Sequence, residues 1–249
     1  MPDDIRTNHI AFETDKRQIF LNEHSEVFSP TGFAQAFARV LEAKLPAKGT
    51  VCELGLGSGV LAILAGLKGA KVVGLDRNQS AVELAQENWF LNDLPATRMD
   101  FRESDLFSGL RSGDENTFDV MWSNPPLLPD VPGINVPDVP KYRNEVSGPL
   151  GRNVLDAMIL QAGQFLKPGG SMLTIATSLQ GWQQTKALLD QNWINWRIID
   201  EVKLPLTDEC GPEYVAWWKA QQDRSGETYL EERGSEMFHT LWFIEAENP

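Results

Sequence analysis

The feature that most constrains the fold is a glycine-rich loop, residues 53–59 (ELGLGSG), set between two apolar segments. Residues 51–54 before the loop are typical of a buried strand, residues 60–65 after it of a helix, and residues 71–75 of a second, β-branched strand. Strand, glycine turn, helix and strand in this order make a βαβ unit, in which the two strands run parallel. The chain is therefore expected to build an α/β sheet.

Strands and helices alternate along most of the remaining chain. Helical patterns are expected at 31–44, behind Thr31 as N-cap, at 80–89, behind a Ser80 and Glu83 capping box, and at 154–165. The expected strands lie at 51–54, 71–75, near 101, and at 119–122, 172–176, 198–206 and 237–246. The last two strands have no usual crossover helix between them, which predicts an antiparallel pair. We expect a Rossmann-like, seven-stranded, mostly parallel sheet with an antiparallel C-terminal strand and helices on both faces.

Length and composition predict one domain in a soluble, cytoplasmic protein. The 249 residues divide into an N-terminal extension, 1–30, and a domain, 31–249, with substrate-covering insertions at 127–150 and 207–235. A net charge of −13 without a basic run argues against a nucleic-acid partner. No apolar run reaches the roughly 20 residues of a membrane span. Two distant cysteines and three scattered histidines predict no metal site.

The glycine loop points to a cofactor that carries a positive charge. Glycines alternate at 55, 57 and 59, whereas a dinucleotide loop has Gly-x-Gly-x-x-Gly and a pyrophosphate at the helix N-terminus. Glu53 would repel a pyrophosphate but can pair with the amino group of a methionyl moiety. Asp76 follows at the tip of the next strand, where it can accept hydrogen bonds from ribose hydroxyls. S-adenosylmethionine therefore fits better than NAD, and an NAD-linked oxidoreductase or a non-catalytic cofactor-binding module remain the alternatives.

A third acidic residue, Asp105, can hold the adenine ring. The Asp105 carboxylate can accept a hydrogen bond from the adenine amino group while Leu106 or Phe107 packs against the ring. Arg77, next to Asp76, is also expected to contact the cofactor.

The segment Ser123-Asn124-Pro125-Pro126 follows an expected strand and predicts the chemistry. An amide or exocyclic nitrogen is a poor nucleophile because its lone pair is delocalised. If the Asn124 side-chain oxygen and the Pro125 carbonyl accept hydrogen bonds from its two N–H groups, they turn the lone pair toward the methyl donor. Pro125 and Pro126 stiffen the turn, so the acceptors are held in advance. Asn-Pro also caps strands without any function. After a cofactor loop of this kind, the segment predicts methyl transfer to nitrogen.

These motifs resemble the class I, Rossmann-like methyltransferases of the Asn-Pro-Pro group, and among them the HemK/PrmC-type glutamine amide methyltransferases. The resemblance covers about residues 27–195 and implies S-adenosylmethionine as cofactor, with Pro30 and Thr31 in a proline-containing motif at the cofactor edge. It implies N-methylation of a small molecule or a protein glutamine, with nucleobase methylation as the alternative. Five residues are candidates for substrate contact: Leu127, Arg143, Tyr214, Trp217 and Trp218.

Overall fold

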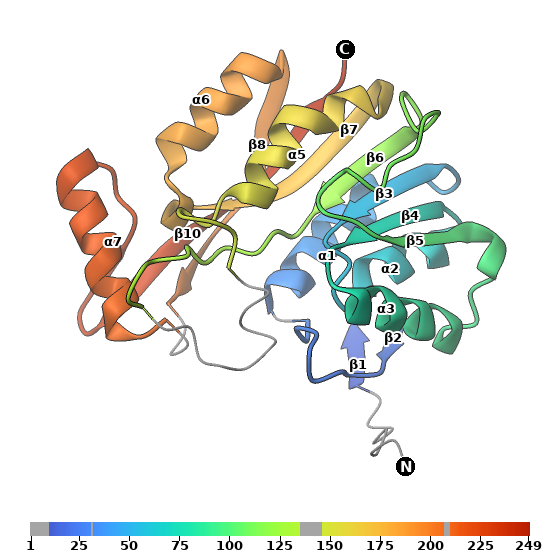
Figure 1. The fold of residues 1–249 in the computed structure, drawn as a ribbon, viewed down its shortest axis with the longest axis horizontal. Coiled ribbons are helices and arrows are strands. Elements are labelled where there is room, and N and C mark those ends of the chain that lie inside the picture. The colour runs from blue at the N-terminus through green and yellow to red at the C-terminus, as the bar shows by residue number, and fades with distance from the viewer. Residues whose placement is uncertain (1–9, 31, 135–145, 207–209) are drawn as a thin grey trace. The chain divides into compact units, whose positions relative to one another are not determined.

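The chain forms two compact units, residues 1–112 and 113–249. The structure, a computed structural model, describes residues 10–30, 32–134, 146–206 and 210–249 (Figure 1). Two of the expected site residues lie outside the described residues: Thr31, expected at the cofactor edge, and Arg143, expected to contact the substrate.

The described residues of the first unit form a β-hairpin, a parallel three-stranded sheet, three α-helices and one short 3-10 helix. Its elements are β1 (Ile10–Glu13), β2 (Gln18–Leu21), α1 (Gly32–Lys44), β3 (Thr50–Leu54), α2 (Val60–Lys68), β4 (Lys71–Asp76), α3 (Gln79–Leu91), a short 3-10 helix (Ala96–Arg98) and β5 (Met99–Glu103). Strand β4 pairs in parallel with β3 on one side and β5 on the other. All three carboxyl ends therefore lie at one edge, and a ligand site is expected there.

Burial explains why these segments form a sheet covered by helices. Residues 51–54 and 72–75 are buried, as expected for parallel strands shielded on both faces. Residues 60–66 of α2 are buried as well, and α2 packs between α1 and α3 (Figure 1). Helix α2 is thereby held directly behind the glycine loop.

The described residues of the second unit form five strands and three α-helices, with two short 3-10 helices. Its elements are β6 (Phe118–Ser123), α5 (Asn153–Gln161), a 3-10 helix (Ala162–Gln164), β7 (Leu166–Thr177), a 3-10 helix (Ser178–Gln180), α6 (Trp182–Asn192), β8 (Asn195–Pro205), α7 (Pro212–Ser225), β9 (Glu231–Arg233) and β10 (Glu236–Glu247). Strand β6 runs parallel to β7, whereas β10 runs antiparallel to β7, β8 and β9. Helix α7 lies near the start of β10, where Met237 packs on the buried cluster that contains Tyr214 and Trp218 (Figure 1).

The structure confirms the expected α/β fold with mostly parallel strands and antiparallel C-terminal strands. Each of the seven expected strands has its counterpart, in β3 to β8 and β10. The expected start of α3 was wrong: the helix begins at Gln79, and its N-cap is Asn78, whose side chain accepts a hydrogen bond from the Ser80 amide. The 207–235 insertion contains helix α7 and strand β9. No helix in the described ranges is long and apolar enough to cross a membrane.

Candidate functional site

The glycine loop follows β3 in the first unit and makes a sharp turn. Gly55 and Gly57 have positive φ angles, 85° and 51°, which side chains with a Cβ rarely adopt. A Cβ added at either position would meet nothing within 4 Å, so there is open space beside the loop. At Gly59 a Cβ would lie 2.8 Å from the Ala85 Cβ, because the loop packs directly on α3. The loop thus offers bare backbone to a ligand on one side and is fixed to a helix on the other.

Two carboxylates flank this loop. Glu53, at the end of β3, is only 2 % exposed. Asp76 ends β4, and its Oδ2 accepts from the Gly57 amide at 3.0 Å while Oδ1 accepts from the Asn78 amide at 2.9 Å. Burial raises the pKa of Asp76 above its ordinary value, against the effect of these hydrogen bonds. A carboxylate has about four lone-pair positions, so Asp76 can shape the loop and still accept from a ligand.

A tight turn after β5 carries Asp105. The Ser104 side chain accepts from the Gly109 amide and donates to the Leu106 carbonyl, both at 2.7 Å. Leu106 has a positive φ of 51°, which few residues other than glycine adopt. Asp105 is exposed and Leu106 is half-buried, so both side chains are accessible at the edge where Asp76 lies. Of the other expected cofactor residues, Arg77 is exposed and Pro30 is half-buried.

Asn88 of α3 is a residue that the sequence analysis missed. It is fully buried, and its Oδ1 accepts from the Asn22 amide at 2.6 Å. Its Nδ2 donates to the carbonyls of Ser58 in the glycine loop, at 2.9 Å, and of Asn22, at 3.3 Å. One amide therefore joins the loop, α3 and the segment after β2. The signal was a polar residue inside the apolar face of a helix, between Ala85 and Trp89.

Further hydrogen bonds attach the N-terminal segment to α3. Asn78 Nδ2 donates to the Glu26 carbonyl at 3.1 Å, and Ser80 Oγ donates to the Glu26 carboxylate at 2.8 Å. Val27 is buried against Ala81 and Leu84 of α3. Residues 18–27, expected to be part of an extension, are thus built into the unit that carries the glycine loop.

The Ser123-Asn124-Pro125-Pro126 segment follows β6 in the second unit. Ser123 is fully buried, and its carbonyl accepts from the Thr174 hydroxyl of β7 at 3.3 Å. Asn124 is half-buried and Pro125 is buried, so the turn leaves a buried strand with its amide side chain partly accessible. This arrangement can present two fixed acceptors to a planar amide.

The described substrate candidates differ in accessibility. Tyr214 and Trp218 are 2 % and 0 % exposed and belong to a buried cluster with Leu179 and Leu230, so neither side chain is exposed to a substrate, in contrast to the expectation from the sequence. Their polar atoms are already bonded: the Tyr214 hydroxyl donates to the Pro129 carbonyl at 3.0 Å, and Trp218 Nε1 donates to the Leu179 carbonyl at 3.1 Å. Leu127 and Trp217 are half-buried and can still reach a ligand.

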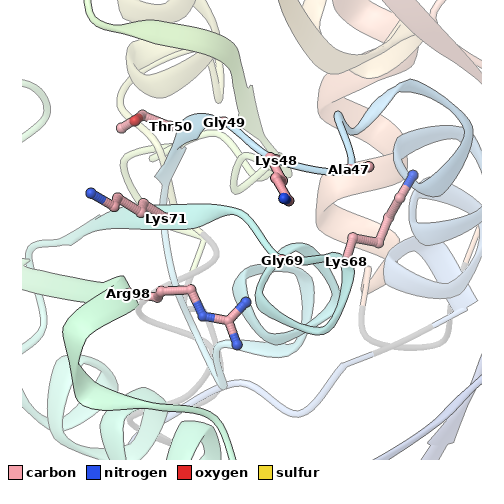
Figure 2. Close-up of a pocket in the computed structure, with 8 residues that line it drawn as sticks. All are labelled: Ala47, Lys48, Gly49, Thr50, Lys68, Gly69, Lys71 and Arg98. Atoms are coloured by element: carbon pink, nitrogen blue, oxygen red, sulfur yellow. The ribbon is translucent and has the colours of Figure 1, made fainter.

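A basic cavity of about 560 Å³ lies at the opposite edge of the first unit's sheet, where β3 and β4 begin (Figure 2). It is lined by Ala47, Lys48, Gly49, Thr50, Lys68, Gly69, Lys71 and Arg98. Lys68 donates to the Glu42 and Leu45 carbonyls at the end of α1, and Arg98 donates to the Gly66 carbonyl in α2. Cations at helix C-termini offset the negative end of the helix dipole. Two of the cations therefore have a structural role, and the cavity is separate from the glycine loop.

Comparisons with known proteins agree with the motifs. The methyltransferase small domain family matches residues 18–132. A Methanocaldococcus jannaschii protein described as a protein N5-glutamine methyltransferase is 33 % identical over 192 residues, 76 % of this chain and 92 % of that protein. A release factor glutamine methyltransferase of Mycobacterium tuberculosis is 30 % identical over 58 % of this chain, and the match spans 49 % of the mycobacterial protein.

A solved structure shares the fold. The E. cuniculi Mtq2–Trm112 complex, described as responsible for methylation of the eRF1 translation termination factor, contains a chain with a TM-score of 0.56 and 17 % identity. The alignment covers 90 % of this chain and 99 % of that chain. With the glycine loop, the acidic strand ends and the Asn-Pro-Pro turn, these relatives identify the family: the chain belongs to the class I, Rossmann-like S-adenosylmethionine-dependent methyltransferases with an Asn-Pro-Pro motif.

Proposed function

We propose that this enzyme methylates the side-chain amide nitrogen of a glutamine in a protein, and that translation release factors are the substrate class. The observation that carries the proposal is the Asn124 amide, half-buried at the end of a buried strand and followed by two prolines. The M. jannaschii and M. tuberculosis relatives, which are described as glutamine methyltransferases, support the choice of acceptor.

The proposed cofactor residues are the ones expected from the sequence: Glu53, Gly55, Gly57, Gly59, Asp76, Arg77, Asp105, Leu106 and Asn124, with Pro30 and Thr31 at the edge of the cofactor site. Three features of the first unit support them. Open space lies beside Gly55 and Gly57, a buried carboxylate at Glu53 precedes the loop, and Asp76 retains acceptor positions toward a ribose. When bound, S-adenosylmethionine supplies an electrophilic methyl group on a sulfonium.

The protein's part in the reaction is alignment and desolvation. Asn124 Oδ1 and the Pro125 carbonyl accept hydrogen bonds from the two amide N–H groups. These bonds hold the plane of the acceptor and expose the nitrogen lone pair. The half-buried Leu127 packs on the amide plane. With the acceptor held in this way, its nitrogen would receive the methyl group that the bound cofactor would supply, and the amide would release one proton to solvent. No covalent enzyme intermediate is required.

The first test is Asn124→Ala. Removing one of two aligned acceptors is expected to lower kcat by about a hundredfold, because an aligned acceptor stabilises only the reactive geometry. Asn192→Ala is the control, since that side chain bonds only to the Leu188 carbonyl on the surface of α6. Near-wild-type turnover of Asn124→Ala would falsify the catalytic role.

The acceptor is identified by labelling a lysate with the radioactive methyl group of the cofactor. Both the chain alone and the chain with lysate proteins are assayed, because the structural relative Mtq2 is part of a complex. A glutamine acceptor predicts label in the protein fraction that acid hydrolysis releases as methylamine, because hydrolysis cleaves the amide bond. Label in the nucleic-acid or small-molecule fraction would favour those acceptors instead. Saturable binding of a nicotinamide cofactor would favour an oxidoreductase.

Calorimetry tests the cofactor residues. Asp76→Ala is expected to weaken binding of S-adenosylhomocysteine at least tenfold, because it removes both the proposed ribose acceptor and the hydrogen bond to the Gly57 amide. If the affinity is unchanged, Asp76 does not hold the ribose.

A further inference from the structure

Helix α7 lies within the 207–235 insertion and presents one buried face. Pro212 occupies its first turn, and Gly226 ends it in a left-handed conformation. Tyr214 and Trp218, four residues apart, share that face, with ring centroids 5.4 Å apart and planes inclined by 28°. Because both rings are buried, α7 is anchored at a defined place on the second unit.

The surface that α7 packs against includes the segment that follows the Asn-Pro-Pro turn. Leu128, Val131 and Ile134 pack on the buried cluster that contains Tyr214 and Trp218. The Tyr214 hydroxyl donates to the Pro129 carbonyl at 3.0 Å. Burial raises the pKa of Tyr214 above its ordinary value, so the hydroxyl keeps its proton at neutral pH and remains a donor.

The other side of the same segment is held by residues 146–148. Leu128 forms a parallel bridge with Val146, and its carbonyl accepts from the Ser147 amide at 2.9 Å. The Asp130 amide donates to the Gly148 carbonyl at 2.8 Å. The backbone groups of residues 128 and 130 are thus bonded to one neighbour, and the intervening carbonyl of Pro129 is bonded to α7.

We propose that Tyr214 is a positioning residue for the methyl acceptor. It holds Pro129, and with it the backbone from Leu127 to Asp130, so that Leu127 and the preceding turn keep the geometry that receives the acceptor amide. The proposal rests on the function proposed above and assigns a role to the insertion: α7 sets acceptor binding through the backbone that follows the Asn-Pro-Pro turn in its own unit.

The test compares Tyr214→Phe with Trp218→Phe. Tyr214→Phe removes one hydroxyl and keeps the ring, so the Pro129 carbonyl loses its donor. Trp218→Phe is the matched control: it removes a buried donor from the same helix and cluster, but that donor bonds to the Leu179 carbonyl in the 3-10 helix after β7. A purely structural role predicts that both variants behave alike.

Two measurements are made on each variant. We expect Tyr214→Phe to speed hydrogen exchange at the Asp130 amide about tenfold. We also expect it to lower kcat/KM about tenfold for the acceptor protein that the labelling experiment identifies. Its affinity for S-adenosylhomocysteine is expected to stay within twofold of wild type. Trp218→Phe is expected to leave both the exchange at Asp130 and the acceptor kcat/KM within threefold of wild type.

The outcomes separate this proposal from the proposed function. If the wild-type enzyme labels no protein, the proposed function fails and the acceptor role of Tyr214 falls with it. If the wild type is active and Tyr214→Phe leaves exchange at Asp130 or acceptor kcat/KM unchanged, only the role of Tyr214 is overturned. An equal loss of cofactor and acceptor binding, or an equal effect of Trp218→Phe, also overturns it.

Discussion

At the scale of single residues, the site depends on buried polar groups and on close backbone contacts. Asn88, Ser104 and Tyr214 are buried, and each bonds to the backbone of a loop. Burying such groups without partners would cost free energy, so their bonds fix the loops in one conformation. Gly151 acts through contact: a Cβ there would lie 2.2 Å from the Leu127 carbonyl oxygen.

Gly151→Ala is therefore expected to displace Leu127 as well as to strain the backbone, whose φ is 70°. We expect a lower melting temperature and at least a tenfold lower rate of methyl transfer, with cofactor binding retained. The control is Gly169→Ala, where φ is 74° but a Cβ meets nothing within 4 Å, so it carries only the conformational strain of about 1 kcal/mol. Equal rates for the two variants would show that contact with Leu127 has no catalytic consequence.

The candidate residues of the site could be proposed from the sequence because their signals are local. Three alternating glycines between a strand and a helix, an acid at the next strand end, and Asn-Pro-Pro after a strand all occur in short windows of sequence. Asn78 was missed as the N-cap because Ser80 and Glu83 offer a competing capping pattern two residues later. Only the geometry shows that the Asn78 side chain accepts from the Ser80 amide.

At the scale of elements, helix α3 connects the N-terminal segment to the glycine loop. One asparagine within α3 and the two that cap it bond backbone groups of that segment: Asn88 to Asn22, the C-cap Asn92 to Phe20, and the N-cap Asn78 to Glu26. Of these three, Asn88 also bonds the loop, through the Ser58 carbonyl. The helix thus provides a comparison between one side chain that reaches the loop and a neighbour that does not.

Asn88→Ala is expected to raise the dissociation constant of S-adenosylhomocysteine about tenfold, because freeing the Ser58 carbonyl loosens the loop by about the net free energy of one hydrogen bond. Asn92→Ala removes three hydrogen bonds, two to Phe20 and one to the Asn88 carbonyl, and none to the loop, so its dissociation constant is expected to stay within twofold of wild type. Calorimetry measures both. If the two variants bind the ligand equally, the Asn88 contact does not support the cofactor loop.

The strands were predictable as elements, whereas helix α7 was not. Long β-branched and apolar runs specify buried strands by themselves. The apolar residues of α7 are few and lie among charges, and the helix is held by burial of Tyr214 and Trp218 against distant parts of the chain. Tyr214 bonds to a residue 85 positions away and Asn88 to one 66 positions away, and no local pattern encodes such pairs.

At the scale of the whole molecule, stability couples to pH through a buried histidine. His239 of β10 is 4 % exposed, and its Nδ1 lies 2.8 Å from the Thr177 hydroxyl at the end of β7. Burial lowers the pKa of His239 to about 4 from 6.5, because the charged ring is poorly solvated in the folded protein. The unfolded chain therefore binds this proton more readily than the folded protein does.

The free energy of unfolding is expected to fall as the pH drops from about 6.5 to about 4, by on the order of 3 kcal/mol from this residue. Above pH 6.5 the ring is neutral in both states, so the contribution is fully present there. Urea unfolding at pH 7, 5.5 and 4.5 measures the dependence. His239→Asn is expected to flatten it, while the same change at the exposed His24 is expected to leave it as in wild type. A slope unaffected by His239→Asn would assign the acid sensitivity to other groups.

The sequence by itself determined the α/β class, the seven main strands and the motifs of a nitrogen methyltransferase, because periodicity, glycine turns and strand-end acids act over a few residues. Tertiary structure decided which polar residues support those motifs. It built residues 18–27 into the unit that carries the glycine loop through Asn88, and it placed α7 against the segment after Asn-Pro-Pro through Tyr214. These contacts join residues far apart in the chain. They form because each polar group is buried and needs a hydrogen-bond partner, so they can be identified only in the folded protein.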